Sequence, residues 1–173
     1  MVVGSTAYRQ QYGLNSITLL LTNMYGPGDV FSVERAHVAS ALIKKFMVAK
    51  RNNEPAVEVL GTGKAIREFL YVEDAAEAIL LAAEKYDNIL PLNVGSGEET
   101  PIAVLAQLIK ELTGYTGTIR WNTNGPDGAL RKVSDISRIR SLLGWEPKYF
   151  LREGLKKTIK WFDEHYDEAV AKP

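Results

Sequence analysis

The sequence predicts an α/β fold, in which short apolar strands alternate with amphipathic helices. The first observation is a set of short apolar runs at 16–21, 57–60, 69–72, 92–94 and 118–121. The second is that segments with apolar residues at steps of three and four lie between these runs, as in helices with one buried face. The third is that glycine, proline and asparagine separate the two kinds of segment. With no internal repeat, this alternation indicates a single α/β unit over residues 1–173.

The helical spacing predicts helices at 8–12, 38–50, 75 to about 86, 102–112, a short one ending at 143, and one that starts at 151 or 152. The last helix should bury Leu155, Thr158, Ile159 and Phe162. Asp74, Thr100 and Asp135 are expected to cap helix N-termini. The expected helix ends are marked by Gly13, Gly114 and Gly144. Residues 22–29 contain several turn formers and are expected to form a loop.

Composition excludes several classes of function. The chain has 21 basic and 21 acidic residues, which gives no electrostatic case for nucleic acid or a membrane surface. Absence of cysteine excludes disulfides and thiolate metal sites, and fits a cytoplasmic location. Two histidines far apart argue against a zinc site, so no metal is expected. Residues 1–6 are too short and too uncharged for a signal peptide, and no apolar run approaches a membrane span.

The central stretch combines a turn, a lone arginine and a second strand. Residues 61–64 are turn formers after a short strand, and Arg67 precedes the apolar run 69–72. A guanidinium at the mouth of a strand suits a phosphate, because its donors form a fixed fork. The alternative is that Arg67 only pairs with Glu68 or Asp74. The residues alone leave both interpretations open.

Three motifs resemble one known family. Residues 67–74 resemble the Arg-Glu/Asp-Phe-x-Tyr/His-Val-x-Asp signature of the extended short-chain dehydrogenases, the NAD-dependent epimerase/dehydratases that act on nucleotide sugars. Residues 22–29 resemble the Asn-x-Tyr-Gly-Pro loop after the sixth strand of that family. Residues 125–132, with Pro-Asp-Gly-x-x-Arg-Lys, resemble the GDP-L-fucose synthases in particular. The resemblance extends from about Tyr8 to Tyr166.

This resemblance implies a substrate-binding, C-terminal part of such an enzyme, with the later strands of its Rossmann-type sheet. The chain contains no G-x-G-x-x-G and no Tyr-x-x-x-Lys, the phosphate turn and the proton-donor pair of the family. We therefore expect a truncated unit that lacks the N-terminal dinucleotide-binding half. That half, or a second copy of the chain, is an expected partner.

The resemblance also implies a set of cations for the substrate diphosphate. Arg67 would hold it, with Arg131 and Lys132 bringing further positive charge. Lys45 occupies a position that is commonly arginine, and Leu60 one that often carries a tryptophan near the guanine. Lysine offers no bidentate fork and leucine cannot stack in the same way. The alternatives are a helix-surface lysine at Lys45 and an exposed basic turn at Arg131 and Lys132.

A second group of residues is implied for the cofactor and the chemistry. By resemblance, Asn23, Met24 and Tyr25 would meet the nicotinamide end of NADP and the sugar. His37, which stands just before a predicted helix, would be the acid that reprotonates the sugar ring during epimerisation. The alternatives are an asparagine that caps its own turn and a histidine that serves as a polar cap or is simply half-buried.

Two functions follow. The first is a fragment of a nucleotide-sugar epimerase/reductase, whose full-length parent epimerises a GDP-4-keto-6-deoxy sugar and reduces it with NADP. Its ligand would be a GDP-sugar or another nucleotide sugar. The alternative is a catalytically incompetent nucleotide-sugar-binding or structural module, which the missing proton-donor pair favours for the chain alone.

Overall fold

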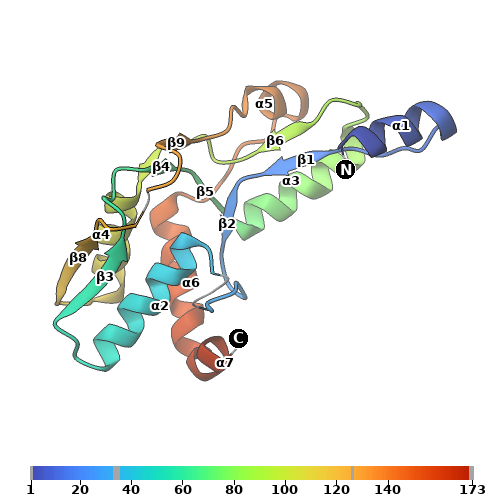
Figure 1. Ribbon diagram of the computed structural model, residues 1–173. Coiled ribbons are helices and arrows are strands. Elements are labelled where there is room, and N and C mark those ends of the chain that lie inside the picture. The colour runs from blue at the N-terminus through green and yellow to red at the C-terminus, as the bar shows by residue number, and fades with distance from the viewer. Residues whose placement is uncertain (1, 33–35, 126, 172–173) are drawn as a thin grey trace.

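The computed structural model describes residues 2–32, 36–125 and 127–171 and confirms the α/β class (Figure 1). The helices are α1 (Val2–Tyr12), α2 (Val38–Arg51), α3 (Val72–Lys85), α4 (Ile102–Thr113), α5 (Ser137–Leu143), α6 (Leu151–Glu164) and α7 (Tyr166–Ala171). The strands are β1 (Leu19–Leu21), β2 (Asn23–Tyr25), β3 (Ala56–Leu60), β4 (Ile66–Arg67), β5 (Phe69–Tyr71), β6 (Leu92–Val94), β7 (Thr100–Pro101), β8 (Thr118–Asn122) and β9 (Arg131–Lys132).

The strands form short, mostly parallel sheets. β1 pairs with β6, β2 with β5 and β3 with β8, all in parallel. β4 lies between β7, which runs antiparallel to it, and β9, which runs parallel. Because β4 and β9 are 65 positions apart in the chain, this pairing joins two motifs that the sequence shows only separately.

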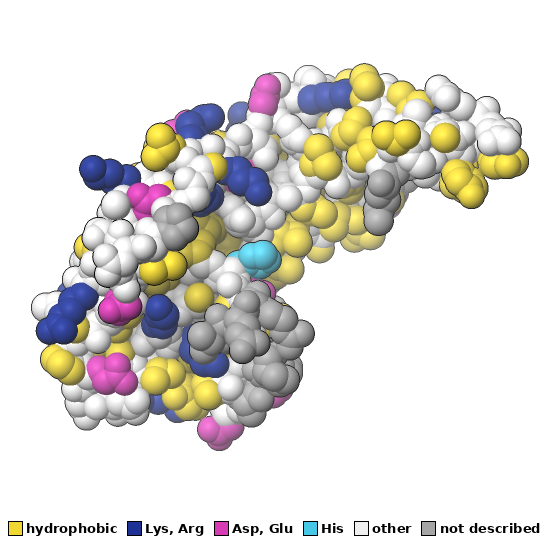
Figure 2. All heavy atoms as spheres, in the orientation of Figure 1, with side chains coloured by type: hydrophobic (Ala, Val, Ile, Leu, Met, Phe, Trp, Pro, Cys, Tyr) yellow, Lys and Arg dark blue, Asp and Glu magenta, His cyan; other side chains and the backbone are white. Residues whose placement is uncertain are grey.

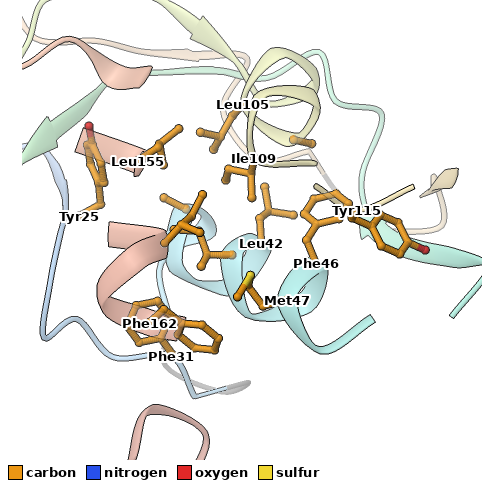
Figure 3. Packing of buried hydrophobic residues seen from close by; sticks show 14 of the residues in the cluster. Tyr25, Phe31, Leu42, Phe46, Met47, Leu105, Ile109, Tyr115, Leu155 and Phe162 are labelled. Atoms are coloured by element: carbon orange, nitrogen blue, oxygen red, sulfur yellow. The ribbon is translucent and has the colours of Figure 1, made fainter. Parts of the chain in front are cut away.

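The molecule is arched, with an arm and a lobe (Figure 1). The arm contains α1, β1, β6, α3 and α5, and its core includes Ala78, Leu92 and Ile139. In the lobe, α2 packs against β3, α4 and α6. Figure 3 shows its larger core, in which Phe31 lies 4.7 Å from Phe162 between ring centroids.

The face predicted for the last helix is confirmed. Leu155, Thr158, Ile159 and Phe162 are all buried on α6. This stripe lies at helical spacing and covers the lobe core, as the periodicity requires. The structure adds α7, a short helix that the sequence did not predict.

Three expectations about segment bounds are corrected. α1 begins at Val2, so the expected helix 8–12 is only its last part. β1 is shorter than 16–21 and not buried, since Leu20 is 46% exposed and only β6 pairs with it. Residues 23–25 form β2 and are not loop, because β5 lies alongside and supplies the ladder hydrogen bonds.

Two of the predicted helix caps are wrong. Asp74 lies inside the first turn of α3, and its buried carboxylate accepts the backbone N–H groups of Lys148 and Tyr149. Thr100 belongs to β7, and the N-cap position of α4 is Pro101. Asp135 receives the backbone N–H of Ser137, the first residue of α5, although the N-cap position of that helix is Ile136. The helix-ending glycines are confirmed by their left-handed φ angles of 62° to 68° at Gly13, Gly114 and Gly144.

Exposed apolar side chains gather on the arm. Figure 2 shows them along its lower edge, where α1 and α3 run in Figure 1. Tyr12 of α1 and Leu80 of α3 are each 66% exposed. Such a contiguous apolar surface is typical of a face that contacts another chain. In the described ranges, no helix combines the length and apolarity needed to cross a bilayer.

Candidate functional site

Two cavities lie on either side of β2. The first, about 270 Å³ in volume, is here called the Arg67 cavity; its lining residues are Asn23, Val38, Leu60, Gly63, Ala65, Arg67, Ile102 and Asp127. The second, about 250 Å³, is called the His37 cavity; its lining residues are Thr22, Met24, Tyr25, Gly26, Pro27, Gly28, Asp29, His37 and Val72. Of the residues of β2, Asn23 lines the first cavity, and Met24 and Tyr25 line the second.

Arg67 is held by backbone carbonyl groups and not by a carboxylate. Its Nη1 donates to the carbonyl oxygens of Ile66 at 2.8 Å and Ala129 at 2.7 Å. Its Nη2 makes a longer contact of 3.4 Å with the carbonyl of Asp127. The alternative that Arg67 pairs with Glu68 or Asp74 is wrong for the described chain, because both carboxylates accept backbone N–H groups elsewhere.

This arrangement leaves part of the guanidinium available. An arginine has five N–H donors, and both of those on Nη1 are used. The Nε–H and one Nη2–H have no acceptor among the described residues. These two adjacent donors form the fork that binds two oxygens of a phosphate or carboxylate. Arg67 is therefore rigidly held and still able to bind an anion in its cavity.

β9 places two predicted cations on different faces. Lys132 is the register partner of Arg67, so their side chains project to the same side of the sheet. Lys132 is exposed, and the described residues include no hydrogen-bond partner for its ammonium. Arg131 instead pairs with Ile66, and its Nη2 lies 2.7 Å from Glu99 Oε1. The hydrogen bond and the charge of Glu99 raise the pKa of Arg131.

The segment between β8 and β9 contributes Asp127 to the lining of the Arg67 cavity. Asp127 accepts hydrogen bonds from the backbone N–H and the hydroxyl of Thr62, at 2.6 and 2.5 Å. These bonds lower the pKa of Asp127. A Cβ added to Gly125 would lie 2.5 Å from Leu60, so loop and strand are in close contact. Pro126, part of the predicted motif, lies outside the described residues.

Leu60 is the last residue of β3, and Lys45 lies on α2 beside that strand. Leu60 lines the Arg67 cavity and is 60% exposed, so it offers an open apolar surface. Lys45 is exposed on α2. Its Nζ donates to the carbonyl of Glu58 at 2.9 Å. The structure thus places Lys45 near β3 but not among the described residues that line the cavity.

The residues predicted for the cofactor are divided between the cavities. Asn23 donates its amide Nδ2 to the carbonyl of Glu68 at 3.0 Å, which leaves its Oδ1 as an acceptor in the Arg67 cavity. Met24 is 37% exposed at the His37 cavity. Tyr25 is only 2% exposed, its hydroxyl donates to the carbonyl of Leu151, and burial raises its pKa.

His37 occupies the N-cap position of α2 with extended backbone angles and makes no capping hydrogen bond through its side chain. Its ring is exposed and lines the His37 cavity with Met24 and Val72. The expectation of a polar cap is therefore wrong. Asp29 anchors the same region, because its carboxylate receives the Ser40 hydroxyl and the Val30 N–H.

Sequence reasoning missed two acidic residues that shape the site. Asp127 was only part of a turn motif, although Asp-Gly is a strong signal for a loop that hydrogen-bonds locally. Glu68 was considered only as an ion-pair partner of Arg67, yet it is 1% exposed and accepts two backbone N–H groups. No spacing rule predicts either contact, because each joins segments more than 25 residues apart. The described residues include no cluster of potential metal ligands.

Comparison with known families defines the class of protein. The model of the NAD dependent epimerase/dehydratase family matches residues 4–95, and the chain belongs to that family. Curated relatives include "Probable GDP-L-fucose synthase 1" of Oryza sativa subsp. japonica, which is 45% identical over 163 residues. This alignment covers 94% of the chain and 49% of the relative. The chain thus spans about half the length of the curated relatives it matches.

Another relative, the GDP-L-fucose synthase of Escherichia coli (strain K12), is 39% identical, with 93% of the chain and 53% of the relative covered. Among solved structures, the match to the GDP-L-fucose synthetase of Naegleria fowleri bound to NADP covers 99% of this chain and 55% of the synthetase chain, at TM-score 0.91 and 29% identity. The match to the UDP-glucose 4-epimerase of Thermotoga maritima with UDP-glucose covers 95% of this chain and 51% of the epimerase chain, at TM-score 0.86 and 31% identity. The predicted resemblance to nucleotide-sugar enzymes is confirmed, and the chain is similar to proteins that use either base.

Proposed function

We propose that the chain supplies the substrate-binding part of a nucleotide-sugar epimerase/reductase of the GDP-L-fucose synthase type. In the full-length parent the activity would be epimerisation and NADP-dependent reduction of a GDP-4-keto-6-deoxy sugar. The observation that carries this proposal is the available fork of Arg67, held in a cavity with Lys132 as its register partner. A diphosphate suits this fork, because its negative charge is opposite to that of the guanidinium and its paired oxygens can accept the two N–H groups.

The remaining lining residues suit the other parts of such a ligand. Leu60 offers an open apolar contact for the base, and Asn23 Oδ1 accepts from a sugar hydroxyl or a carboxamide. Lys45 and Arg131 are secondary in this proposal, because their cationic groups already bind the Glu58 carbonyl and the Glu99 carboxylate. Asp127 turns its carboxylate to Thr62, so its charge is hydrogen-bonded before an anionic ligand enters.

The His37 cavity is proposed as the place of the chemistry. Met24 and Val72 give it apolar walls, which fit the nicotinamide end of NADP. In its reduced form, the bound cofactor would supply the hydride for the reduction. His37 would return a proton to the sugar ring during epimerisation, and its side chain is exposed and makes no capping hydrogen bond. Tyr25 would support this wall from the core, with only its backbone near a ligand.

The exposed apolar residues of α1 and α3 support a further part of the proposal, that this face contacts a dinucleotide-binding half or a second copy of the chain.

Calorimetric titration of the purified chain with a GDP-sugar and a UDP-sugar tests the proposed function. Because Leu60 cannot stack as an aromatic would, both nucleotides are expected to bind weakly and with similar affinity. Heat that saturates with either ligand supports the binding site. No heat with either would favour the alternative, a structural module that keeps the fold without the ligand.

A further inference from the structure

Glu68 connects three separate segments around the Arg67 cavity. It lies between β4 and β5, directly after Arg67, and is 1% exposed. Its Oε2 accepts the backbone N–H of Gly97 at 2.9 Å, and its Oε1 accepts that of Ser134 at 2.6 Å. Its backbone carbonyl accepts the side-chain amide of Asn23 at 3.0 Å. The site is closely packed, since a Cβ added to Gly95 would lie 2.6 Å from Glu68 Oε2.

Two of these segments carry a register partner of Arg67. Ser134 follows Lys132 by two residues, and Lys132 is the register partner of Arg67 on β9. Gly97 precedes Thr100 by three residues, and Thr100 is the register partner on β7. Both flanking strands are only two residues long, so their own ladder hydrogen bonds fix them weakly. The buried Glu68 carboxylate adds a further restraint on both strands, because it accepts backbone N–H groups near each of them.

We propose that Glu68 is a positioning residue that holds β7 and β9 on either side of Arg67 and thereby sets the separation of Arg67 from Lys132. The inference rests on the proposed function, because that separation matters only if a diphosphate binds both cations. Glu68 does not touch the ligand in this account. It acts through the backbone of the strands that carry or flank the cations.

Asp74 provides a matched control within the same chain. It is also 1% exposed, and its two oxygens accept the N–H groups of Lys148 and Tyr149 at 2.9 and 3.1 Å. Its partners lead into α6, and neither cavity takes a described lining residue from 145–151. The two carboxylates therefore perform the same structural work, but only Glu68 is connected to the cations.

The experiment compares Glu68→Gln with Asp74→Asn. A carboxamide has one accepting oxygen, so each variant leaves one of two N–H groups without an acceptor, and both should lose thermal stability to a similar degree. Of the two variants, only Glu68→Gln should weaken GDP binding, by about tenfold. Its effect on GMP binding should be smaller, because a single phosphate has fewer oxygens to reach both Arg67 and Lys132. Equal GDP affinity in the two variants would overturn the inference and leave the proposed function intact.

A second measurement needs no variant. In the wild-type chain, saturation with GDP should slow amide hydrogen exchange at Gly97 and Ser134, because a diphosphate bound to Arg67 and Lys132 restrains β4 and β9, and β7 pairs with β4. Exchange at Lys148 and Tyr149 should not change. Unchanged exchange at Gly97 and Ser134 in the GDP-bound chain would contradict the inference. If the wild-type chain binds no GDP, the proposed function fails and the inference fails with it.

Discussion

The two cavities differ in how firmly their key residues are held. Around the Arg67 cavity, the guanidinium is bound by three carbonyl groups, and Asp127 ties the loop beside it to Thr62. In the His37 cavity, the histidine ring is exposed and makes no capping hydrogen bond. Pre-organised groups bind a ligand without an ordering cost, and loosely held ones do not. The chain thus fixes the residues proposed for substrate binding more firmly than the residue proposed for catalysis.

The largest expected effect concerns catalysis. We predict that the purified chain does not oxidise NADPH with any keto-sugar nucleotide. The chain contains no Tyr-x-x-x-Lys pair, so the hydride step lacks its usual proton donor. Absorbance of NADPH measures this directly, with a full-length GDP-L-fucose synthase as the positive control. A steady loss of absorbance that requires both chain and substrate would show that this half carries out the chemistry.

A smaller effect is expected from the pair of hydrogen bonds that Asp127 accepts from Thr62, here called the Asp127 clasp. Its pKa is lowered by the hydrogen bonds from Thr62, so the clasp stabilises the fold above the ordinary aspartate value of about 3.9. That stabilisation is lost as the pH falls through the lowered folded-state value. Asp127→Asn should therefore remove part of the acid dependence of thermal unfolding. Curves of melting temperature against pH that stay parallel in wild type and variant would rule out the clasp.

The smallest effect should come from His37. It lines the cavity on the other side of β2 from Arg67, so His37→Gln should change the affinity for GDP by less than about twofold, well below the tenfold that 1.4 kcal/mol represents. Titration with GDP measures it. A loss of tenfold or more would show that the two cavities act as a single site and would break the comparison.

Local patterns predicted much of the fold. The buried face of α6 follows from spacing alone, and Gly13, Gly114 and Gly144 end their helices because glycine adopts a positive φ without strain. The caps failed where tertiary contacts competed. Asp74 was expected to bond its own helix, but it is buried against the segment before α6.

The sequence predicted several residues of the candidate site but not how they are arranged in space. The family resemblance suggested Arg67 and the pair Arg131 and Lys132 but could not show which of the pair lies beside Arg67. That depends on the register of β4 and β9, which are distant in the chain. A shift of one residue would exchange Lys132 for Arg131. The contacts of Glu68 depend on the same long-range pairing.

The proposed function depends most on Arg67, which would bind the diphosphate. Arg67→Ala and Arg131→Ala each remove one guanidinium from paired neighbouring strands, and only Arg67 keeps free donors in the cavity. A charge-assisted hydrogen bond contributes about 1.5–3 kcal/mol. Calorimetric titration should therefore show that Arg67→Ala weakens GDP- and UDP-sugars alike by about tenfold or more, while Arg131→Ala has little effect. Wild-type affinity in Arg67→Ala would contradict the account and remove Arg67 from the site.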